Sequence, residues 1–473
     1  MSADTFLLGG TASSSGGPVA SNNGSSFFAI SSNSGDIQSA TETQIQVKLG
    51  AQTLDKGFSH CFSISGGFTG IFGTHLNGAN GNVAITITAT GDAEDTTHSD
   101  SVSAGGLFDW RSTGNAGGSS AITAGVFGCH VSGATTELYT PQIVGGSTYN
   151  YSGTANGYTP WGARVGALTN GTEVNTQCKQ RAAGSWSNQR ANVSSNSIAA
   201  TMNIVFRKNA TTGNQVCAYA TTATGIVEDT THTDAVASGD LTNDGYTTST
   251  ATGSANIFFV HTTFSPSAHL WDTLGTMGNV ETSSSNVTFY PILGQDSAGN
   301  TTEALVQYRY RVANNVANLR GFWINNFSST GAMTYRVNGA NGNGAVTPTS
   351  SGTGYFEDST HHDTIASGDQ GDVACGITTS LGWQVNIMLT FGVATNAAAT
   401  LTLLGQFSQT INAVNQDASH IATQFGQFSQ AFAATDEPTF QATIAQTFGL
   451  FGTAVNAVDL GAGTGGIRQF WTF

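Results

Sequence analysis

The sequence predicts a mainly β protein: three tandem antiparallel β-sandwich or jelly-roll domains followed by a C-terminal α-helical segment. Two observations predict the three domains. A seven-residue acidic phrase occurs three times, and short runs of alternating apolar and polar residues lie between Gly-rich turns. A third observation, an unbroken heptad pattern of apolar residues after residue 395, predicts the helix.

The acidic phrase defines the repeats. Residues 94–100 read Glu-Asp-Thr-Thr-His-Ser-Asp, residues 228–234 read Glu-Asp-Thr-Thr-His-Thr-Asp, and residues 357–363 read Glu-Asp-Ser-Thr-His-His-Asp. The copies begin 134 and then 129 residues apart, which is the signature of a duplicated unit. We therefore expect three domains, called repeats 1, 2 and 3 below, at 1–133, 134–263 and 264–395. Residues 396–473 form a separate segment.

The composition is polar but almost uncharged. Only 9% of residues are Asp, Glu, Lys or Arg, and the formal net charge is −15. Such a surface repels phosphate groups, so we expect no nucleic-acid partner. Hydrophobic residues make up 38% of the chain and aromatic residues 10%, and they supply a core that a disordered chain would lack.

The chain shows no targeting or spanning segment. Its first ten residues lack the basic and apolar regions of a signal peptide, and no run of 18 apolar residues exists, so neither export by a signal peptide nor membrane insertion is expected. The five cysteines are odd in number and do not recur at equivalent repeat positions. We interpret them as small buried core residues.

Within each repeat the elements follow the same order. An early strand carries Gln-x-Lys/Arg at 46–48, 177–179 and 307–309, and in repeat 3 apolar and polar residues alternate from 306 to 312. Asn-Gly at 77–78 and 338–339 predicts tight hairpins. Val83, Ile85 and Ile87 then alternate with polar or small residues, which predicts a strand. Each repeat closes with an apolar strand, at 122–131, 257–261 and 383–391.

The acidic phrase is interpreted as structural, because Asp and Thr side chains that bond nearby backbone order a turn between two strands. The residues assigned this role are Asp95, His98, Asp229, His232, Asp358 and His361. A calcium or other divalent site and a catalytic site remain alternatives. However, the phrase lacks the internal Gly of a calcium loop and contains a His. No metal ion, cofactor or catalytic residue is predicted.

No enzyme motif is present. The chain contains no nucleophile elbow, phosphate loop, Cys-x-x-Cys or His-Glu-x-x-His. A pair of carboxylates for glycoside cleavage stays an alternative, because its members need not be close in the sequence. The threefold repetition argues against catalysis, since three identical active sites in one chain are rarely needed.

The C-terminal segment is expected to drive oligomerisation or anchoring. Its apolar positions follow the heptad spacing of about four heptads of helix, and they include Leu404, Phe407, Ile411, Val414, Ile421, Phe425, Phe428 and Phe432. Two alternatives stay open: a hairpin folded onto its own chain, or pairing between subunits in a trimer or other symmetric homo-oligomer.

A Gly-rich stretch then ends in three aromatic residues, Phe470, Trp471 and Phe473. These aromatic side chains either dock in a pocket on a neighbouring molecule or fold back onto their own chain.

The order of these marks resembles a β-sandwich module of tailed-bacteriophage structural proteins, including tail-fibre proteins. The resemblance covers roughly residues 20–395 and is carried best by Arg-Val-Asn-Gly-Ala at 336–340 and by residues 228–240. Repeat 1 departs from it at 104–106, which lacks the Asp after Gly, and at His75, which stands in place of Arg. The resemblance implies a protein of the virion surface or of an appendage, and virions assemble in the host cytoplasm without a signal peptide.

These expectations favour a non-enzymatic virion structural protein, a tail fibre or a decoration of the particle surface. Its partners in assembly would be other virion proteins and further copies of itself, and a host-surface glycan is the candidate partner in host attachment. The alternative is an extracellular adhesin or filament subunit at the cell surface. An enzyme acting on surface polysaccharide is a third hypothesis.

Overall fold

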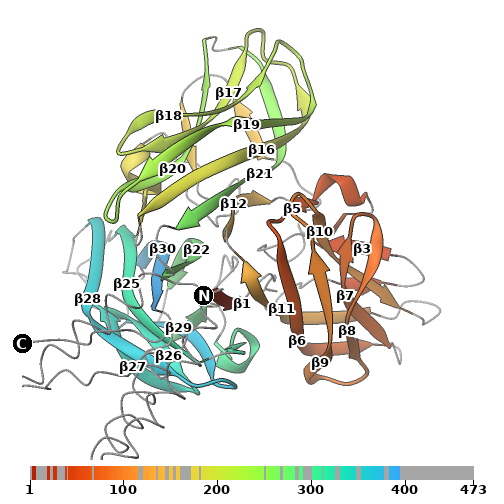
Figure 1. Cartoon of the computed structure of the whole chain (residues 1–473). Helices are drawn as coiled ribbons and strands as arrows, with labels where there is room; N and C mark the ends of the chain where they lie inside the picture. Colours follow the sequence, from red (N-terminus) through yellow and green to blue (C-terminus); the bar gives the residue numbers. More distant parts are fainter. Residues whose placement is uncertain are drawn as a thin grey trace, which may run out of the picture. The chain divides into compact units, whose positions relative to one another are not determined.

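A computed structural model describes parts of the chain between residues 3 and 394 (Figure 1). The described residues are 3–6, 19–21, 25–28, 38–39, 41–65, 69–114, 121–134, 137–143, 149–152, 156–159, 172–180, 183–249, 252–266, 270–282, 287–290, 301–311, 313–324, 331–347, 353–377 and 383–394. The chain divides into two compact units, Met1–Asn396 and Ala397–Phe473. The predicted heptad helix and aromatic tip, Leu404 to Phe473, lie outside the described residues.

The described part of the chain is mainly β, as predicted. Its strands form six sheets, and all the pairings between the described strands are antiparallel. The helical elements among the described residues are three short 3₁₀ segments: η1 (Glu42–Gln44), η2 (Glu173–Thr176) and η3 (Glu303–Leu305). Within these residues no helix is long and apolar enough to cross a membrane.

Repeat 1 contains two sheets. The first has the order β1 (Ala3–Phe6), β11 (Ala121–Ala134), β6 (Gln52–Ser65), β9 (Gly91–Val102), and β2 (Val19–Ser21) also pairs with β11. The second has the order β4 (Gln38–Ser39), β3 (Ser25–Phe28), β10 (Leu107–Gly114), β7 (Gly70–Leu76), β8 (Ala79–Ile87), and β5 (Val47–Lys48) also pairs with β10.

Repeat 2 has the same arrangement. One sheet has the order β12 (Glu137–Ile143), β21 (Ser254–Pro266), β16 (Gly184–Asn196), β19 (Gly225–Val236), with β13 (Tyr149–Ser152) on β21. The other has the order β14 (Gly157–Thr159), β20 (Leu241–Thr248), β17 (Met202–Lys208), β18 (Thr211–Tyr219), with β15 (Cys178–Lys179) on β20. Strand β21 continues to Pro266, past the predicted boundary after residue 263.

Repeat 3 repeats the pattern once more. Its first sheet has the order β22 (Leu270–Thr282), β30 (Trp383–Ala394), β25 (Asn314–Ile324), β28 (Thr353–Ile365). Its second has the order β23 (Thr288–Tyr290), β29 (Gln370–Ile377), β26 (Gly331–Val337), β27 (Ala340–Val346), with β24 (Tyr308–Arg309) on β29. The predicted strand at 306–312 is therefore only two residues long.

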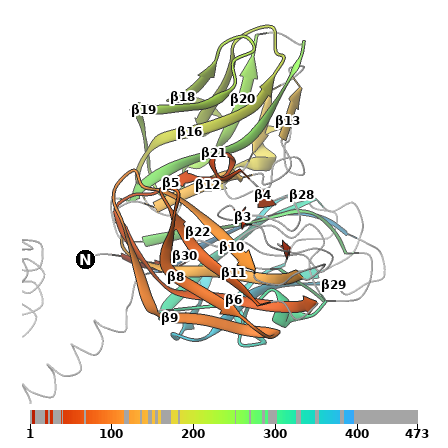
Figure 2. The ribbon, with the colours of Figure 1, turned by 90° about the vertical axis from the view of Figure 1, so that its right-hand side faces the viewer.

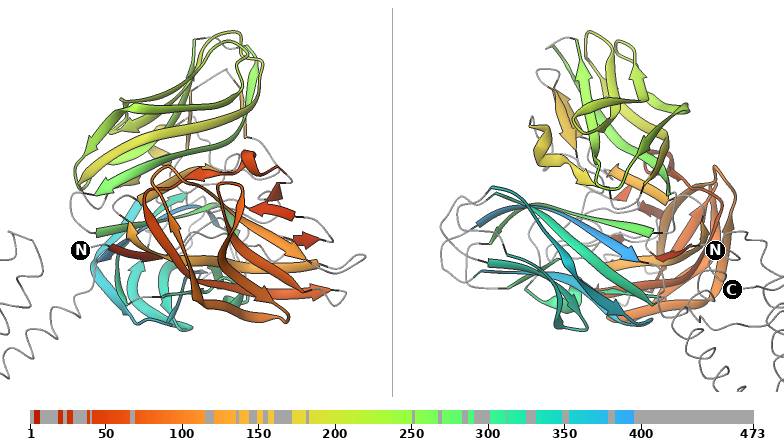
Figure 3. Two further views of the ribbon diagram at one scale, coloured as in Figure 1. Left: turned by 45° about the vertical axis from the view of Figure 1, so that its right-hand side comes forward. Right: turned by 60° about the vertical axis from the view of Figure 1, so that its left-hand side comes forward.

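The two sheets of a repeat pack face to face over a hydrophobic core, as the ribbons of repeat 1 in Figure 2 and repeat 3 in the right panel of Figure 3 illustrate. In repeat 1 the rings of Phe72 on β7 and Phe127 on β11 stack across the layers with centroids 5.4 Å apart. In repeat 2 the rings of Tyr151 on β13 and Tyr246 on β20 are in tilted contact across the layers, with centroids 5.7 Å apart. Full burial of each such side chain contributes about 1.5–3 kcal/mol, so the aromatic residues hold the layers together.

Local sequence signals place the hairpins and strands as predicted. Asn77 and Gly78 have φ of 51° and 81° between β7 and β8, the left-handed pair that an Asn-Gly turn needs, and Asn338 and Gly339 repeat it. Val83, Ile85 and Ile87 are fully buried on one side of β8. All five cysteines are buried and unbridged, as expected for core residues.

Candidate functional site

The acidic phrase lies inside a strand in each repeat: β9, β19 and β28. The prediction of a turn between two strands is wrong, because the phrase forms a bulge within one strand. In repeat 2 the register passes from Ser187↔Thr233 to Gln189↔Asp229, so three residues of the phrase oppose Asn188 alone. Asn188 takes a left-handed φ of 56°, and this conformation lets its strand pass the bulge.

The first Asp of the phrase holds the bulge together. In repeat 2 the Asp229 carboxylate accepts bonds from the backbone N–H groups of Thr231 and His232, each at 3.1 Å, and from that of Val216 on β18 at 2.9 Å. His232 Nδ1 lies 2.9 Å from Asp229 Oδ2. Although burial acts to raise its pKa, these bonds favour the ionised form and hold the pKa of Asp229 at about 2. Asp95 with His98, and Asp358 with His361, have the same arrangement.

The last Asp of the phrase ties the bulge to the opposing sheet. Asp234 is buried and accepts bonds from the backbone N–H groups of Asn214 at 2.7 Å and Gln215 at 3.1 Å, both on β18. A Cβ at Gly213 would lie 2.6 Å from its Oδ1, so the approach requires glycine there. Equivalent Asp residues in repeats 1 and 3 make the same bonds.

The Glu that begins the phrase pairs with a cation from another repeat. Lys48 of repeat 1 pairs with Glu228 of repeat 2, and Lys179 of repeat 2 lies 2.7 Å from Glu357 of repeat 3. Arg309 of repeat 3 closes the series by pairing with the corresponding Glu of repeat 1, Glu94. The three cations are the basic residues of the Gln-x-Lys/Arg marks, so two recurring sequence features meet at three equivalent junctions, 1 to 2, 2 to 3 and 3 to 1.

A second cation completes each junction. Arg190 stands opposite Glu228 in the strand register and donates to the carbonyl oxygen of Gln46 in repeat 1 at 2.9 Å. Arg320 stands opposite Glu357 and donates to the carbonyl oxygen of Gln177 at 3.2 Å. Both arginine side chains are therefore buried between repeats, where desolvation lowers the pKa of Arg190.

At the junction between repeats 3 and 1, the second cation comes from the repeat that carries the Gln-x-Lys/Arg mark and not from the repeat that carries the Glu. The position that corresponds to Arg190 holds Phe58 in repeat 1. Arg311 of repeat 3 covers the Phe58 ring, with its guanidinium carbon 5.1 Å from the ring centroid, and it lies 3.1 Å from Glu94. Every junction thus combines one Glu with two cations, and together they use six of the 14 cationic side chains.

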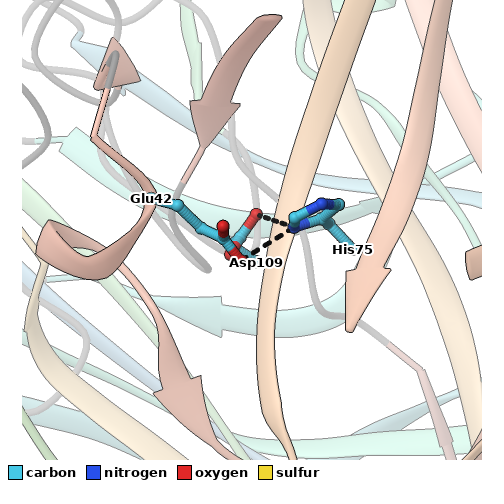
Figure 4. Close-up of side chains that lie close together, drawn as sticks. All are labelled: Glu42, His75 and Asp109. Atoms are coloured by element: carbon cyan, nitrogen blue, oxygen red, sulfur yellow. Dashed lines mark ion pairs between the residues drawn. The ribbon is translucent and has the colours of Figure 1, made fainter. Parts of the chain in front are cut away.

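A different cluster lies within repeat 1, where Glu42, His75 and Asp109 converge (Figure 4). Glu42 begins η1, while His75 on β7 and Asp109 on β10 are directly paired across strands. His75 Nδ1 lies 3.0 Å from Glu42 Oε1 and 3.4 Å from Asp109 Oδ1. Burial, aided by the Glu42 charge, raises the pKa of Asp109 to about 9, and burial lowers the pKa of His75.

The same position in the other repeats holds an arginine–glutamate pair. Arg207 binds both carboxylate oxygens of Glu173, at 2.8 and 2.7 Å, and Arg336 binds both of Glu303, at 2.6 and 3.0 Å. The residues paired across strands with these arginines, and so equivalent to Asp109, are Asn243 and Asp372.

Sequence reasoning missed most of these residues. The junction partners are 178 to 215 residues apart in the chain, so no local pattern connects them. His75 did carry a signal, because it replaces the Arg of the other repeats. Glu42 and Asp109 carried none. The sequence-predicted residues 404–473 cannot be related to these sites, since they lie outside the described residues.

Comparison with known proteins gives no relative: neither the protein-family models nor the curated protein sequences contain a match to this chain.

Proposed function

We propose that the chain is a non-enzymatic structural protein of a bacteriophage particle, a tail fibre or a decoration of the particle surface. In this proposal the three repeats are tandem jelly-roll domains. Their strand orders support it, because in each repeat the chain crosses to the other sheet after every long strand except at one hairpin, β7–β8, β17–β18 or β26–β27, as in a jelly roll. The resemblance to phage β-sandwich modules supplies the link to a virion, assembled in the host cytoplasm.

One observation carries the structural role: the cation of the Gln-x-Lys/Arg mark and the first Glu of the acidic phrase, which recur in all three repeats, join one repeat to another. Lys48, Lys179 and Arg309 each pair with the first Glu of another repeat's acidic phrase. Ion pairs and buried guanidinium contacts of this kind fix orientation and register between surfaces. A catalytic role would instead require the recurring residues to face a substrate.

The C-terminal segment supplies the assembly step in this proposal. Residues 396–473 pair with other copies of the chain or with other virion proteins, and the sandwich surfaces face neighbours or host-surface glycan. The net charge of −15 disfavours nucleic acid as a partner.

Mass spectrometry of purified phage particles from cells that make the chain tests the proposal. We expect the chain in the particles at a fixed ratio to the other structural proteins. Its absence from particles, together with its recovery from the cell surface, would favour the adhesin or filament alternative. Release of oligosaccharides from host envelope glycan by the purified chain would overturn the non-enzymatic assignment.

A further inference from the structure

The Glu42–His75–Asp109 cluster is where repeat 1 departs chemically from repeats 2 and 3. Those repeats fill the position with a guanidinium that neutralises the adjacent Glu. Repeat 1 keeps the Glu and the strand Asp but replaces the guanidinium with an imidazole. We propose that this cluster binds a divalent transition-metal ion, with Zn²⁺ the best match, which takes the place of the missing guanidinium.

The spacing of the three side chains fits such an ion. Ligand atoms about 2.0–2.1 Å from a tetrahedral Zn²⁺ lie about 3.3–3.4 Å from one another. His75 Nδ1 is 3.0 Å from Glu42 Oε1 and 3.4 Å from Asp109 Oδ1, and the three ligand atoms all lie within 4.8 Å of one another. Small side-chain shifts would therefore complete the coordination, and a fourth position remains for water.

The state of Asp109 gives an independent indication of a ligand. Its side chain is fully buried, and it lies beside the side chains of Gln46, Glu42 and His75, so that two carboxyl groups share one imidazole. A buried carboxylate beside a second carboxylate is costly, and a divalent cation would neutralise both. Figure 4 shows this carboxyl group directed at His75 Nδ1.

The donor set selects among metals. One imidazole nitrogen with two carboxylate oxygens suits Zn²⁺, whereas Mg²⁺ and Ca²⁺ take about six or more oxygen ligands. Binding through Nδ1 places the remaining imidazole proton on Nε2.

A neighbouring cation offers the competing explanation. Arg111 lies two residues beyond Asp109 on β10, and its guanidinium donates to the side-chain oxygen of Asn80. Should Arg111 alone balance the two carboxyl groups, the protein would bind no Zn²⁺. A direct binding measurement separates the two cases.

The test is isothermal titration of the metal-free full-length chain with Zn²⁺ alone, and with Mg²⁺ as a comparison. We expect one tight Zn²⁺ site per chain and no comparable Mg²⁺ site. His75→Arg should weaken that site by about 100-fold or more, since it removes a ligand and restores the ion pair of the other repeats. Asp109→Asn, which installs the residue found in repeat 2, should also weaken it.

The substitutions imitate residues already present at equivalent positions, so both variants are expected to fold, which circular dichroism checks. His98→Ala removes an exposed His elsewhere in repeat 1 and should leave the site unchanged. The proposal is overturned if the wild-type chain binds no Zn²⁺ beyond its Mg²⁺ response. It is equally overturned if a folded His75→Arg or Asp109→Asn variant binds Zn²⁺ as tightly as the wild type.

Discussion

Replacing Asp229 with Ala should release the bulge of repeat 2. The substitution removes the acceptor of three backbone N–H groups, those of Val216, Thr231 and His232. The bond to Val216 also joins β19 to β18 of the facing sheet. Its loss therefore weakens both the local bulge and the contact between the two layers.

Two routes give the size of the effect. An unsatisfied, partly buried N–H costs about 1–3 kcal/mol, and the loss of the bonds to the two exposed N–H groups, which regain water, costs about 0.5–1 kcal/mol each, so Asp229→Ala should cost about 2–5 kcal/mol. Independently, the pKa falls from 3.8 to about 2, and at about 1.4 kcal/mol per unit the ionised carboxylate stabilises the fold by about 2 kcal/mol. Asp229→Asn, which loses only the charge, should thus cost less than Asp229→Ala.

Hydrogen exchange of the full chain measures this locally. A loss of about 3 kcal/mol raises the exchange rate of the β18 amides by about 100-fold. His232→Ala is the matched control, because its side chain is 59% exposed and contributes one contact to the same carboxylate. We expect it to change exchange by less than about threefold. Equal exchange in Asp229→Ala and His232→Ala would refute the role assigned to the carboxylate.

Three further predictions concern acid stability, the junctions and assembly. Asp95 and Asp229 have pKa values of about 2 in the folded protein and about 3.8 in the unfolded chain, so their ionised forms stabilise the fold above pH 3.8. The free energy of unfolding should therefore fall by about 2 kcal/mol for each group as the pH drops from about 4 to 2, which acid unfolding curves measure. Glu228→Lys places a third cation beside Lys48 and Arg190 and should lower the free energy of unfolding by about 2–4 kcal/mol. Adding Lys48→Glu should restore part of this stability, and no recovery would argue against the pairing. A chain ending at residue 395 should sediment as a monomer, and an unchanged oligomer would contradict the assembly role of residues 396–473.

The sequence was sufficient where a local pattern has one physical meaning. Asn-Gly at 77–78 needs two left-handed residues and so marks a hairpin, and the alternation at 83–87 marks a strand with one buried face. The acidic phrase was less specific, because an Asp that bonds the N–H groups two and three residues ahead serves a bulge as well as a turn. Its place inside β19 depends on Asn188 of the opposing strand.

Long-range pairing was beyond the sequence. Lys48 and Glu228 each stand out as members of a recurring mark, yet nothing local says that the marks meet, or that they do so between repeats. The alternation at 306–312 puts Arg311 on the polar face of the predicted strand, whereas its side chain is buried against repeat 1 over Phe58. The candidate metal cluster combines residues from three elements, and only tertiary structure brings them together.

Carbodiimide crosslinking, which joins an amine directly to a carboxylate in contact with it, tests the junctions between repeats most directly. The chain has only four lysines, and two of them, Lys48 and Lys179, pair with Glu of another repeat. Mass spectrometry of the monomer-sized product should find Lys48 joined to Glu228 and Lys179 to Glu357. Arg309→Lys should add a third crosslink, to Glu94. Absence of these crosslinks, or their formation only between chains, would contradict the account.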